Sequence, residues 1–220
     1  MFKNRIFTGR SNDGISNLSE NELKEYVLIA RTAVEKYVRE GEVIDGSDFG
    51  INKLDPNCGL FVTLYGRFNN KNELRGCIGH IVPNSEVPTS IIDIAIKAAT
   101  QDPRFYPVKE HELRNIIFEV SFLSEPRIIN TKDKYEYFNK IKIGKDGLIL
   151  ESNYGLGVLL PQVAVEHKWN VEQYLVNLCA KTGAPSNSWL LPSSKIFRFE
   201  TFIFSEKEPY GDIIKIKIKI

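Results

Sequence analysis

The sequence predicts an α+β protein with a mainly antiparallel sheet flanked by helices. Segments with the alternating, β-branched pattern of strands are joined by short polar turns, which suit antiparallel rather than parallel pairing. Segments with a helical period of apolar residues lie between these strand pairs. The chain has 220 residues, of which 42% are hydrophobic, so it can bury a core without disulfides or structural metals.

Charge and cysteine content exclude several classes of protein. Lys and Arg number 29 against 28 Asp and Glu, so no global field attracts the chain to nucleic acid or anionic membranes. We find neither an apolar run near the roughly 20 residues of a membrane span nor a signal peptide. The three cysteines are irregularly spaced, and a single Met accompanies abundant Ile and Lys. We therefore expect a cytoplasmic protein with reduced thiols and a thermophilic composition.

The first predicted helix begins after Ser19 and ends at Gly41. Ser19 and Glu22 have the spacing of a capping box, and apolar residues recur at helical intervals after them. Gly41 supplies a C-terminal stop. Residues 1–17 lack this periodicity, so we expect a loosely ordered N-terminal arm.

Two strands at residues 59–65 and 74–81 are expected to form a hairpin around a polar turn at 69–72. A helix over residues 88–100 follows. It ends before Asp102-Pro103, because a residue that precedes proline disfavours helical geometry.

The second half of the chain continues the alternation. We expect a strand at 116–123, a hairpin turn at the Asp146-Gly147 step within 141–150, and helices at 161–167 and 171–182. The last two predicted strands are a single one over 197–204 and an edge strand over 213–220, where Ile alternates with outward Lys.

The densest group of chemically useful residues is the segment from Leu74 to His80. In a regular strand Arg75 and Cys77 share one face, and Leu74, Ile78 and His80 share the other. Arg75 beside Cys77 would favour a thiolate nucleophile and could hold an anion, while Gly76 and Gly79 would let a ligand approach. Equally, Cys77 could be a small buried hydrophobe, with the glycines serving close sheet packing.

His80 adds two further options. Cys77-x-x-His80 is half of a zinc site, but no second close pair completes it, so we predict no metal and no cofactor. A Cys–His couple would require Gly79 to break the strand, because His80 otherwise lies on the opposite face.

Two other segments offer polar side chains that could line a cleft. The loop from Asp102 to Pro107 carries Asp102 and Arg104, which either pair and cap nearby backbone or face a ligand. Glu119 and Ser121 share one strand face; Glu119 either faces solvent or acts as a general base. The common phosphate-loop, zinc-protease and serine-hydrolase motifs are absent from the sequence.

The segment Leu74-Arg75-Gly76-Cys77-Ile78-Gly79 resembles the signature of the AMMECR1 family. Further family-like motifs follow in order: Phe61-Val62-Thr63-Leu64 before it, then Ala98-Ala99, Asp102-Pro103-Arg104-Phe105, Glu119-Val120-Ser121, Ile143 to Leu148, Leu159 to Ala164, and Trp189. The resemblance covers residues 18–206; it leaves out the 1–17 arm and a 207–220 tail. It implies an archaeal or bacterial protein of one larger and one smaller lobe, and we expect the signature to line the cleft between them.

The resemblance also suggests a function without assigning a reaction. Family members occur beside Memo-like and radical-SAM proteins, which suggests a pathway that modifies RNA or another macromolecule. The first hypothesis is an enzyme or enzyme partner with Cys77 and Glu119 as catalytic candidates and a cleft lined by Arg75, Gly76, Gly79, His80, Asp102, Arg104 and Ser121. The alternatives are a protein-interaction module, and a nucleic-acid binder using the small basic cluster of Arg67, Lys71 and Arg75. A homodimer paired through the Ile/Lys tail is compatible with each of them.

Overall fold

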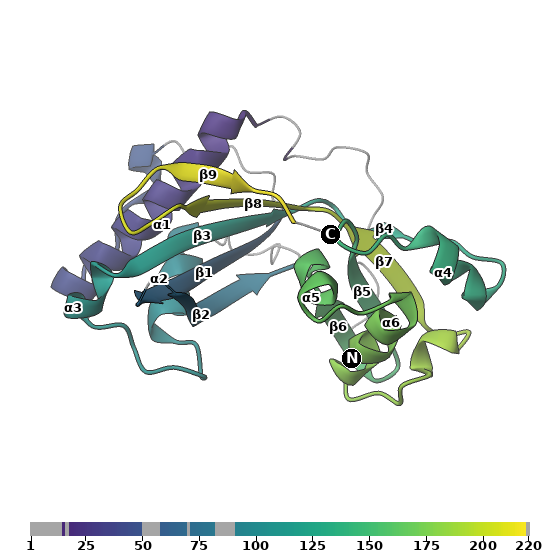
Figure 1. Cartoon of the computed structure of the whole chain (residues 1–220). Coiled ribbons are helices and arrows are strands. Elements are labelled where there is room, and N and C mark those ends of the chain that lie inside the picture. The colour runs from purple at the N-terminus through teal and green to yellow at the C-terminus, as the bar shows by residue number, and fades with distance from the viewer. Residues whose placement is uncertain (1–14, 16–17, 50–57, 70, 82–90, 219–220) are drawn as a thin grey trace. The chain divides into compact units, whose positions relative to one another are not determined.

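A computed structural model of the chain describes residues 15, 18–49, 58–69, 71–81 and 91–218 (Figure 1). The helices and strands, in chain order, are α1 (Glu20–Glu40), the 3-10 turn η2 (Gly46–Phe49), β1 (Gly59–Phe68), β2 (Lys71–His80), α2 (Ile91–Thr100), α3 (Glu110–Leu113), β3 (Ile116–Leu123), β4 (Arg127–Ile128), η3 (Lys134–Glu136), α4 (Tyr137–Lys140), β5 (Gly147–Ser152), β6 (Gly155–Leu159), α5 (Pro161–Glu166), α6 (Val171–Ala180), η4 (Ser188–Leu190), β7 (Lys195–Phe199), β8 (Thr201–Glu206) and β9 (Ile213–Ile216). Apart from Ile15, the predicted 1–17 arm lies outside the described residues.

The predicted α+β fold is confirmed, with mainly antiparallel sheets and flanking helices. The chain divides into a larger and a smaller unit. The larger contains the described residues up to Leu123 together with Phe202–Ile216; the smaller contains Ser124–Thr201. Each unit has its own sheet and its own hydrophobic core.

The larger unit is built on a five-stranded sheet of order β2-β1-β3-β8-β9. Helices α1 and α2 pack on one face of this sheet, which we call the helix face (Figure 1). Its central side chains are apolar and buried, including Val62, Leu64, Phe118 and Val120, each 0% exposed. The alternation predicted for residues 116–123 is therefore confirmed: Ile116, Phe118, Val120 and Phe122 of β3 enter the core beneath α1 and α2.

Helix α1 forms as its terminal signals predict. The Ser19 hydroxyl accepts the Glu22 backbone N–H at 3.2 Å, and the Glu22 carboxylate accepts the Ser19 N–H at 2.8 Å. Gly41 ends the helix at φ +70°, a left-handed conformation that favours glycine. Helix α2 ends at Thr100, as predicted, while the predicted start at residue 88 lies outside the described residues.

The predicted β1–β2 hairpin is confirmed, but its register contains a bulge. Leu64 pairs with Gly76 and Tyr65 with Leu74, which leaves Arg75 as the extra residue. The prediction that Leu74 shares a face with Ile78 and His80 is therefore wrong, because the bulge shifts the alternation by one residue. Both strands also extend into the predicted turn, so that Phe68 pairs with Lys71.

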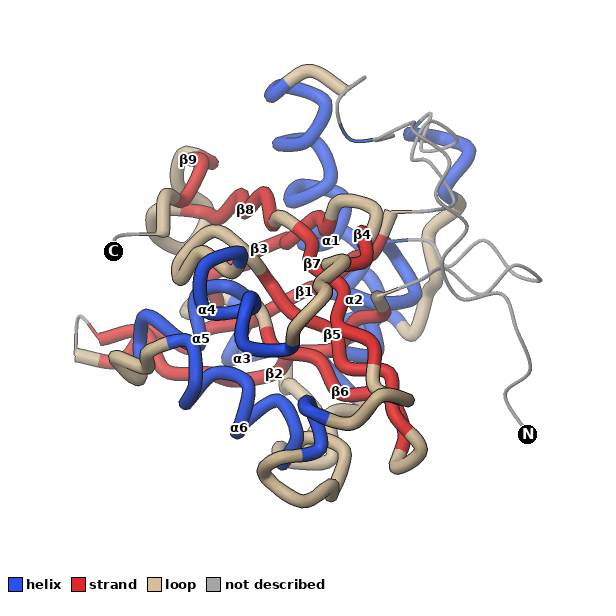
Figure 2. The backbone as a smooth tube through the Cα atoms, turned by 90° about the vertical axis from the view of Figure 1, so that its right-hand side faces the viewer, coloured by secondary structure: helices blue, strands red, loops and turns tan. Residues whose placement is uncertain are grey.

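The smaller unit has a four-stranded sheet of order β4-β7-β5-β6, and α5 and α6 lie beside β5 and β6 (Figure 2). The predicted hairpin at Asp146-Gly147 is wrong, since the element directly before the turn into β5 is α4 and not a strand. Instead the Asp146 carboxylate accepts the Lys142 backbone N–H at 2.8 Å and closes a turn between α4 and β5. Helices α5 and α6 are confirmed, and Asn170 with Gln173 forms a capping box on α6.

The late strand predicted over residues 197–204 is two strands. β7 belongs to the sheet of the smaller unit and β8 to the sheet of the larger one, with a break at Glu200. At the C-terminus, β9 is an edge strand as predicted, but it ends at Ile216 rather than continuing through the described residues 217–218. Lys215 lies on its helix-face side and pairs with Glu20 of α1 at 2.7 Å; residues 219–220 lie outside the described residues.

Candidate functional site

A row of polar side chains crosses three strands on the sheet face opposite α1 and α2. Cys77 of β2 pairs with Thr63 of β1, and Thr63 pairs with Glu119 of β3. We call this the Cys77 face; it also carries Tyr65 and Ser121. The Thr63 hydroxyl donates a hydrogen bond to the Cys77 sulfur at 3.3 Å. The row thus brings together two residues predicted from the sequence, Cys77 and Glu119, through Thr63, which was not predicted.

The Cys77 thiol is held in its protonated form. Burial raises its pKa, and the negative charges of Asp102 and Glu119 raise it further. The Thr63 hydrogen bond and the positive charge of Arg104 lower the pKa; each outweighs the Asp102 or Glu119 charge, but burial is the largest effect and the pKa is raised. Cys77 is therefore a thiol at neutral pH, and Glu119 is one of the groups that determine its pKa.

The loop after α2 clamps the backbone of Cys77. The Cys77 N–H donates to the Asp102 carboxylate at 2.8 Å, and the Cys77 carbonyl accepts from the Arg104 guanidinium at 3.3 Å. Arg104 also donates to both carboxylate oxygens of Asp102, at 2.9 and 2.6 Å. Because β2 is an edge strand, this pair satisfies backbone groups that a further strand would otherwise bond.

The clamp also fixes the charge state of Asp102. Its hydrogen bonds from Arg104 and from the Cys77 N–H hold the pKa of this carboxyl far below its usual range. Asp102 is 4% exposed, so the carboxylate is a buried, fully ionised part of the loop. The alternative in which Asp102 and Arg104 pair and cap backbone is thus what the structure shows, and the backbone they cap is that of Cys77.

Arg75 lies at the bulge and does not act on the thiol. Its guanidinium makes two hydrogen bonds to Glu112 of α3, at 2.9 and 3.1 Å, and lies 5.9 Å from the Phe105 ring centroid. The positive charge that lowers the Cys77 pKa comes from Arg104 instead. Glu112 was not predicted, since nothing in the sequence indicates that a bulge would aim Arg75 toward α3.

His80 and the two glycines serve the packing of β2. The register is continuous from Gly76 to His80, so His80 faces away from Cys77 and no Cys–His couple forms. A Cβ at Gly76 would overlap the carbonyl oxygen of Ala98 in α2. A Cβ at Gly79 would overlap the Phe61 ring and the Leu60 carbonyl oxygen. Both glycines therefore allow close contacts within the larger unit.

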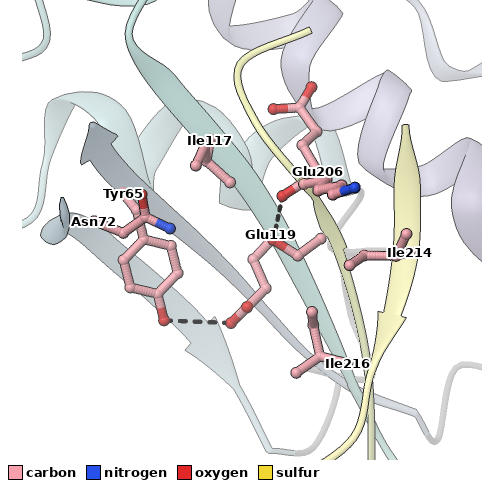
Figure 3. A pocket seen from close by; sticks show the side chains of 9 residues that line it. Tyr65, Asn72, Ile117, Glu119, Glu206, Ile214 and Ile216 are labelled. Atoms are coloured by element: carbon pink, nitrogen blue, oxygen red, sulfur yellow. Dashed lines mark hydrogen bonds between the residues drawn. The ribbon is translucent and has the colours of Figure 1, made fainter. Parts of the chain in front are cut away.

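A pocket of about 240 Å³ adjoins the polar row at Glu119 (Figure 3). The Tyr65 hydroxyl points at the Glu119 carboxylate and donates to it at 3.5 Å. The lining residues come from five strands and the β8–β9 turn: Tyr65, Asn72, Ile117, Glu119, Ser205, Glu206, Lys207, Ile214 and Ile216. The C-terminal Ile/Lys segment thus supplies two of the lining residues, Ile214 and Ile216.

Ser121 lies on the same face as Glu119, pairs with Phe61 and is 2% exposed. Among the described residues, no group of three or more His, Cys, Asp or Glu side chains gathers as metal ligands would. Within the same ranges, none of the helices has the length and apolar character of a membrane span.

Comparison with known proteins identifies relatives over most of the chain. A sequence profile described as AMMECR1 matches residues 27–204. Protein MJ0810 of Methanocaldococcus jannaschii is 43% identical over 192 residues, which are 87% of this chain and 94% of that protein. Protein PF1979 of Pyrococcus furiosus is 42% identical over 189 residues, covering 85% and 89% of the two chains.

A solved structure agrees with these sequence matches. The crystal structure of the uncharacterized protein PH0010 from Pyrococcus horikoshii superposes with a TM-score of 0.81 at 38% sequence identity. The match covers 91% of this chain and 98% of that one. The resemblance inferred from the Leu74–Gly79 signature is therefore confirmed, and the chain belongs to the AMMECR1 family.

Proposed function

We propose that the protein is an enzyme, or the reacting subunit of one, whose chemistry takes place on the Cys77 face. The observation that carries this proposal is the cross-strand row of Cys77, Thr63 and Glu119, with a pocket beside Glu119. Polar groups at half-buried positions of a sheet are costly unless they are hydrogen-bonded or paired. Here the Thr63 hydroxyl hydrogen-bonds the Cys77 sulfur, and Glu119 lies opposite Thr63 on the adjacent strand.

In this proposal Cys77 is the nucleophile and Glu119 the proton acceptor, with Thr63 between them. The thiol is protonated at rest because burial raises its pKa, to which the Glu119 charge adds a smaller contribution. A ligand group that offsets the Glu119 charge would lower the Cys77 pKa and so favour the thiolate, which is the reactive form. The Asp102–Arg104 clamp holds Cys77 in place during such a step.

The other proposed details come from the family resemblance. We assign the reaction to a pathway that modifies a macromolecule, in which Memo-like and radical-SAM proteins would be partners. The proposal also keeps two predictions from the sequence. One is a C-terminal tail over residues 207–220; the other is a cleft lined by Arg75, Gly76, Gly79, His80, Asp102, Arg104 and Ser121.

A second candidate function is a protein-interaction module. It is favoured by the packing roles of Gly76 and Gly79 and by the raised pKa of Cys77, all of which explain the signature without chemistry. Nucleic-acid binding has less support, because two members of the predicted basic cluster are ion-paired. Arg67 pairs with Glu208 at 3.3 Å and Arg75 with Glu112 at 2.9 Å.

The test is the pH dependence of iodoacetamide alkylation at each cysteine of the folded protein, read by peptide mass spectrometry. Cys58 and Cys179 are 8% and 0% exposed and serve as internal controls. We expect Cys77 to react first, with a midpoint above the ordinary thiol value of about 8.5. Glu119→Gln should lower that midpoint, whereas Glu73→Gln, an exposed residue of β2, should not.

Two results would contradict the proposal. If Cys77 reacts only when Cys58 and Cys179 do, it is a core residue and the interaction module is the better function. If Cys77 reacts but its midpoint is unchanged by Glu119→Gln, the two side chains are not coupled and Glu119 is not its proton acceptor.

A further inference from the structure

The outer edge of β2 directs backbone groups away from the sheet beside Cys77. β2 is the last strand of the five-stranded sheet, so β1 is the strand that pairs with it (Figure 1). The Cys77 N–H and carbonyl bond the clamp residues Asp102 and Arg104, and they therefore point away from β1. Bonding alternates along an antiparallel strand, and the register is continuous as far as His80. The N–H and carbonyl of Gly79 therefore point outward as well.

The outward groups of Gly79 differ from those of Cys77 in having no bond. Among the residues that the structure describes, none bonds the Gly79 N–H or its carbonyl oxygen. One donor and one acceptor on the same residue are the groups through which a strand bonds its neighbour. The clamp thus closes the edge at Cys77 and leaves it open two residues further along β2.

The side chains of this part of β2 do not protect the edge against an added strand. Exposed edges are usually guarded by charged side chains, lysine above all. The opposite edge of the same sheet, β9, carries Lys215. From Gly76 to His80, in contrast, β2 has no charged side chain at neutral pH, because burial lowers the pKa of His80 and raises that of Cys77.

The Cys77 face offers a contact for a side chain of an added strand. Phe61 pairs with Gly79, and a Cβ at Gly79 would overlap the Phe61 ring, so this ring covers the glycine. A residue that pairs with Gly79 from outside would direct its own side chain to the same face, beside Phe61. It would also be a diagonal neighbour of Cys77, at about 7–8 Å, which is within reach of a long side chain.

We propose that the β2 edge at Gly79 binds an extended polypeptide segment as an added strand, with one side chain of that segment beside Cys77. A peptide group supplies both the acceptor and the donor that the Gly79 N–H and carbonyl require. A nucleic acid fits less well, because the charge of the adjacent Arg104 is already paired with Asp102 at 2.6 Å. The inference rests on the proposed function, since it names the substrate class of the same site.

The first measurement is amide hydrogen exchange of the isotope-labelled protein, followed residue by residue by NMR. Ile78, whose backbone groups face β1, is the internal control. Relative to its intrinsic rate, the Gly79 N–H should exchange about tenfold faster or more than that of Ile78. Equal protection of the two would mean that the edge is already covered. Protection of Gly79 that rises with protein concentration would mean that a second copy covers it; either result would overturn the proposal.

The second measurement adds the neutral, capped peptide acetyl-Thr-Val-Thr-Val-Thr-amide. Its matched control is the same peptide with every backbone N–H methylated, which cannot donate to the edge. We expect the unmodified peptide to slow exchange at Gly79 and to shift the Gly79 resonance to saturation, with Ile78 unchanged and the methylated peptide inactive. No effect at Gly79, or an equal effect of the methylated peptide, would show that the edge does not pair with a polypeptide backbone.

Two variants of β1 test where the peptide lies. Phe61→Leu should weaken binding about twofold to fivefold, because the aromatic contact with a β-branched side chain is lost. Phe68→Leu is the matched control: Phe68 is 50% exposed and ends β1 at the turn, so binding should be unchanged. A loss in Phe68→Leu as large as that in Phe61→Leu would place the peptide elsewhere and overturn the proposal.

Exchange at Gly79 and alkylation of Cys77 are separate readouts, so the two proposals can fail separately. If the peptide protects Gly79 but Cys77 proves unreactive toward iodoacetamide, the proposed enzyme fails and the polypeptide site stands. If alkylation behaves as expected but the peptide leaves Gly79 unprotected, the polypeptide substrate fails and the proposed enzyme stands.

Discussion

The two faces of the five-stranded sheet are made by alternate residues of the same strands, yet they differ in kind. On the helix face, Val62, Leu64 and Phe118 are apolar, fully buried and explained by the packing of α1 and α2. On the Cys77 face, Thr63, Cys77 and Glu119 are polar and bonded or electrostatically coupled to one another. The helix face therefore explains why the unit folds. The Cys77 face also buries Ile117 and Leu123, but its polar row needs a different explanation, which we take to be function.

The largest expected effect is on the helix face. Phe118→Ala should lower the free energy of unfolding by about 3–5 kcal/mol, because it removes a fully buried ring and leaves a cavity. Urea denaturation measures this change. A loss below about 1 kcal/mol would mean that the helix face is not the core of the larger unit, and the comparison would fail.

A second prediction concerns the one ion pair on the described helix face in which both side chains are buried, Arg31–Glu206. Arg31 donates to Glu206 at 2.5 Å and lies over the rings of Phe118 and Tyr210, at 4.6 and 4.0 Å from their centroids. The Glu206 carboxylate also accepts the Phe118 backbone N–H at 2.9 Å. Glu206→Gln should therefore lower the free energy of unfolding by about 2–3 kcal/mol, since the buried Arg31 then keeps only its ion pair with the less buried Glu35, at 3.0 Å.

The matched control for this variant is Glu208→Gln. Glu208 also pairs with an arginine, Arg67, at 3.3 Å, but its side chain is 62% exposed. An exposed pair contributes little, so this change should stay within about 0.5 kcal/mol. Equal losses in the two variants would show that burial does not distinguish the pairs.

The third prediction addresses the clamp on Cys77 and has a pH dependence. Asp102→Asn should lower the free energy of unfolding at pH 7 by about 1–2 kcal/mol, because it weakens charge-assisted bonds to Arg104 and to the Cys77 N–H. The folded pKa of Asp102 lies below its unfolded value of about 3.9, so its contribution is full above that pH and fades as the pH falls toward the folded pKa.

Unfolding curves between pH 7 and pH 2 test this sign. The difference between the parent protein and Asp102→Asn should be constant down to about pH 4 and should then shrink. Asp212→Asn, at an exposed residue, is the control and should follow the parent at every pH. A difference that grows as the pH falls would mean that Asp102 is not held as a carboxylate.

Local signals predicted most of the fold, because they depend on residues close in sequence. The Ser19 capping box, the Gly41 stop and the alternation of β3 needed no tertiary information. The failures came where distant segments decide. The Asp146-Gly147 step has the composition of a hairpin turn, but its Asp side chain caps a turn after α4. The late strand splits at Glu200 because its two halves pair with different sheets.

The candidate site was only partly predictable for the same reason. Alternation correctly separated Cys77 from His80. The bulge at Arg75 could not be foreseen, and it decides both that Cys77 pairs with Thr63 and that Arg75 bonds Glu112. The pocket could not be foreseen either, since it depends on β9, a segment the family resemblance did not include.

The smallest effect on stability is expected at the centre of the Cys77 face. Thr63→Val keeps the side-chain shape and suits a strand, so the free energy of unfolding should change by only about 1 kcal/mol, the contribution of one neutral hydrogen bond. The pKa of Cys77 should nevertheless rise, because the Thr63 hydroxyl that donates to the sulfur at 3.3 Å is lost. Thr63→Ser retains the hydroxyl and should keep the alkylation midpoint of the parent protein. If Thr63→Val destabilised the protein as much as Phe118→Ala, or left the alkylation midpoint unchanged, the two faces would not differ in the way proposed: the polar row would then be another part of the core. A shifted midpoint at nearly constant stability would show that the Thr63 hydroxyl acts on the Cys77 sulfur rather than on the stability of the fold.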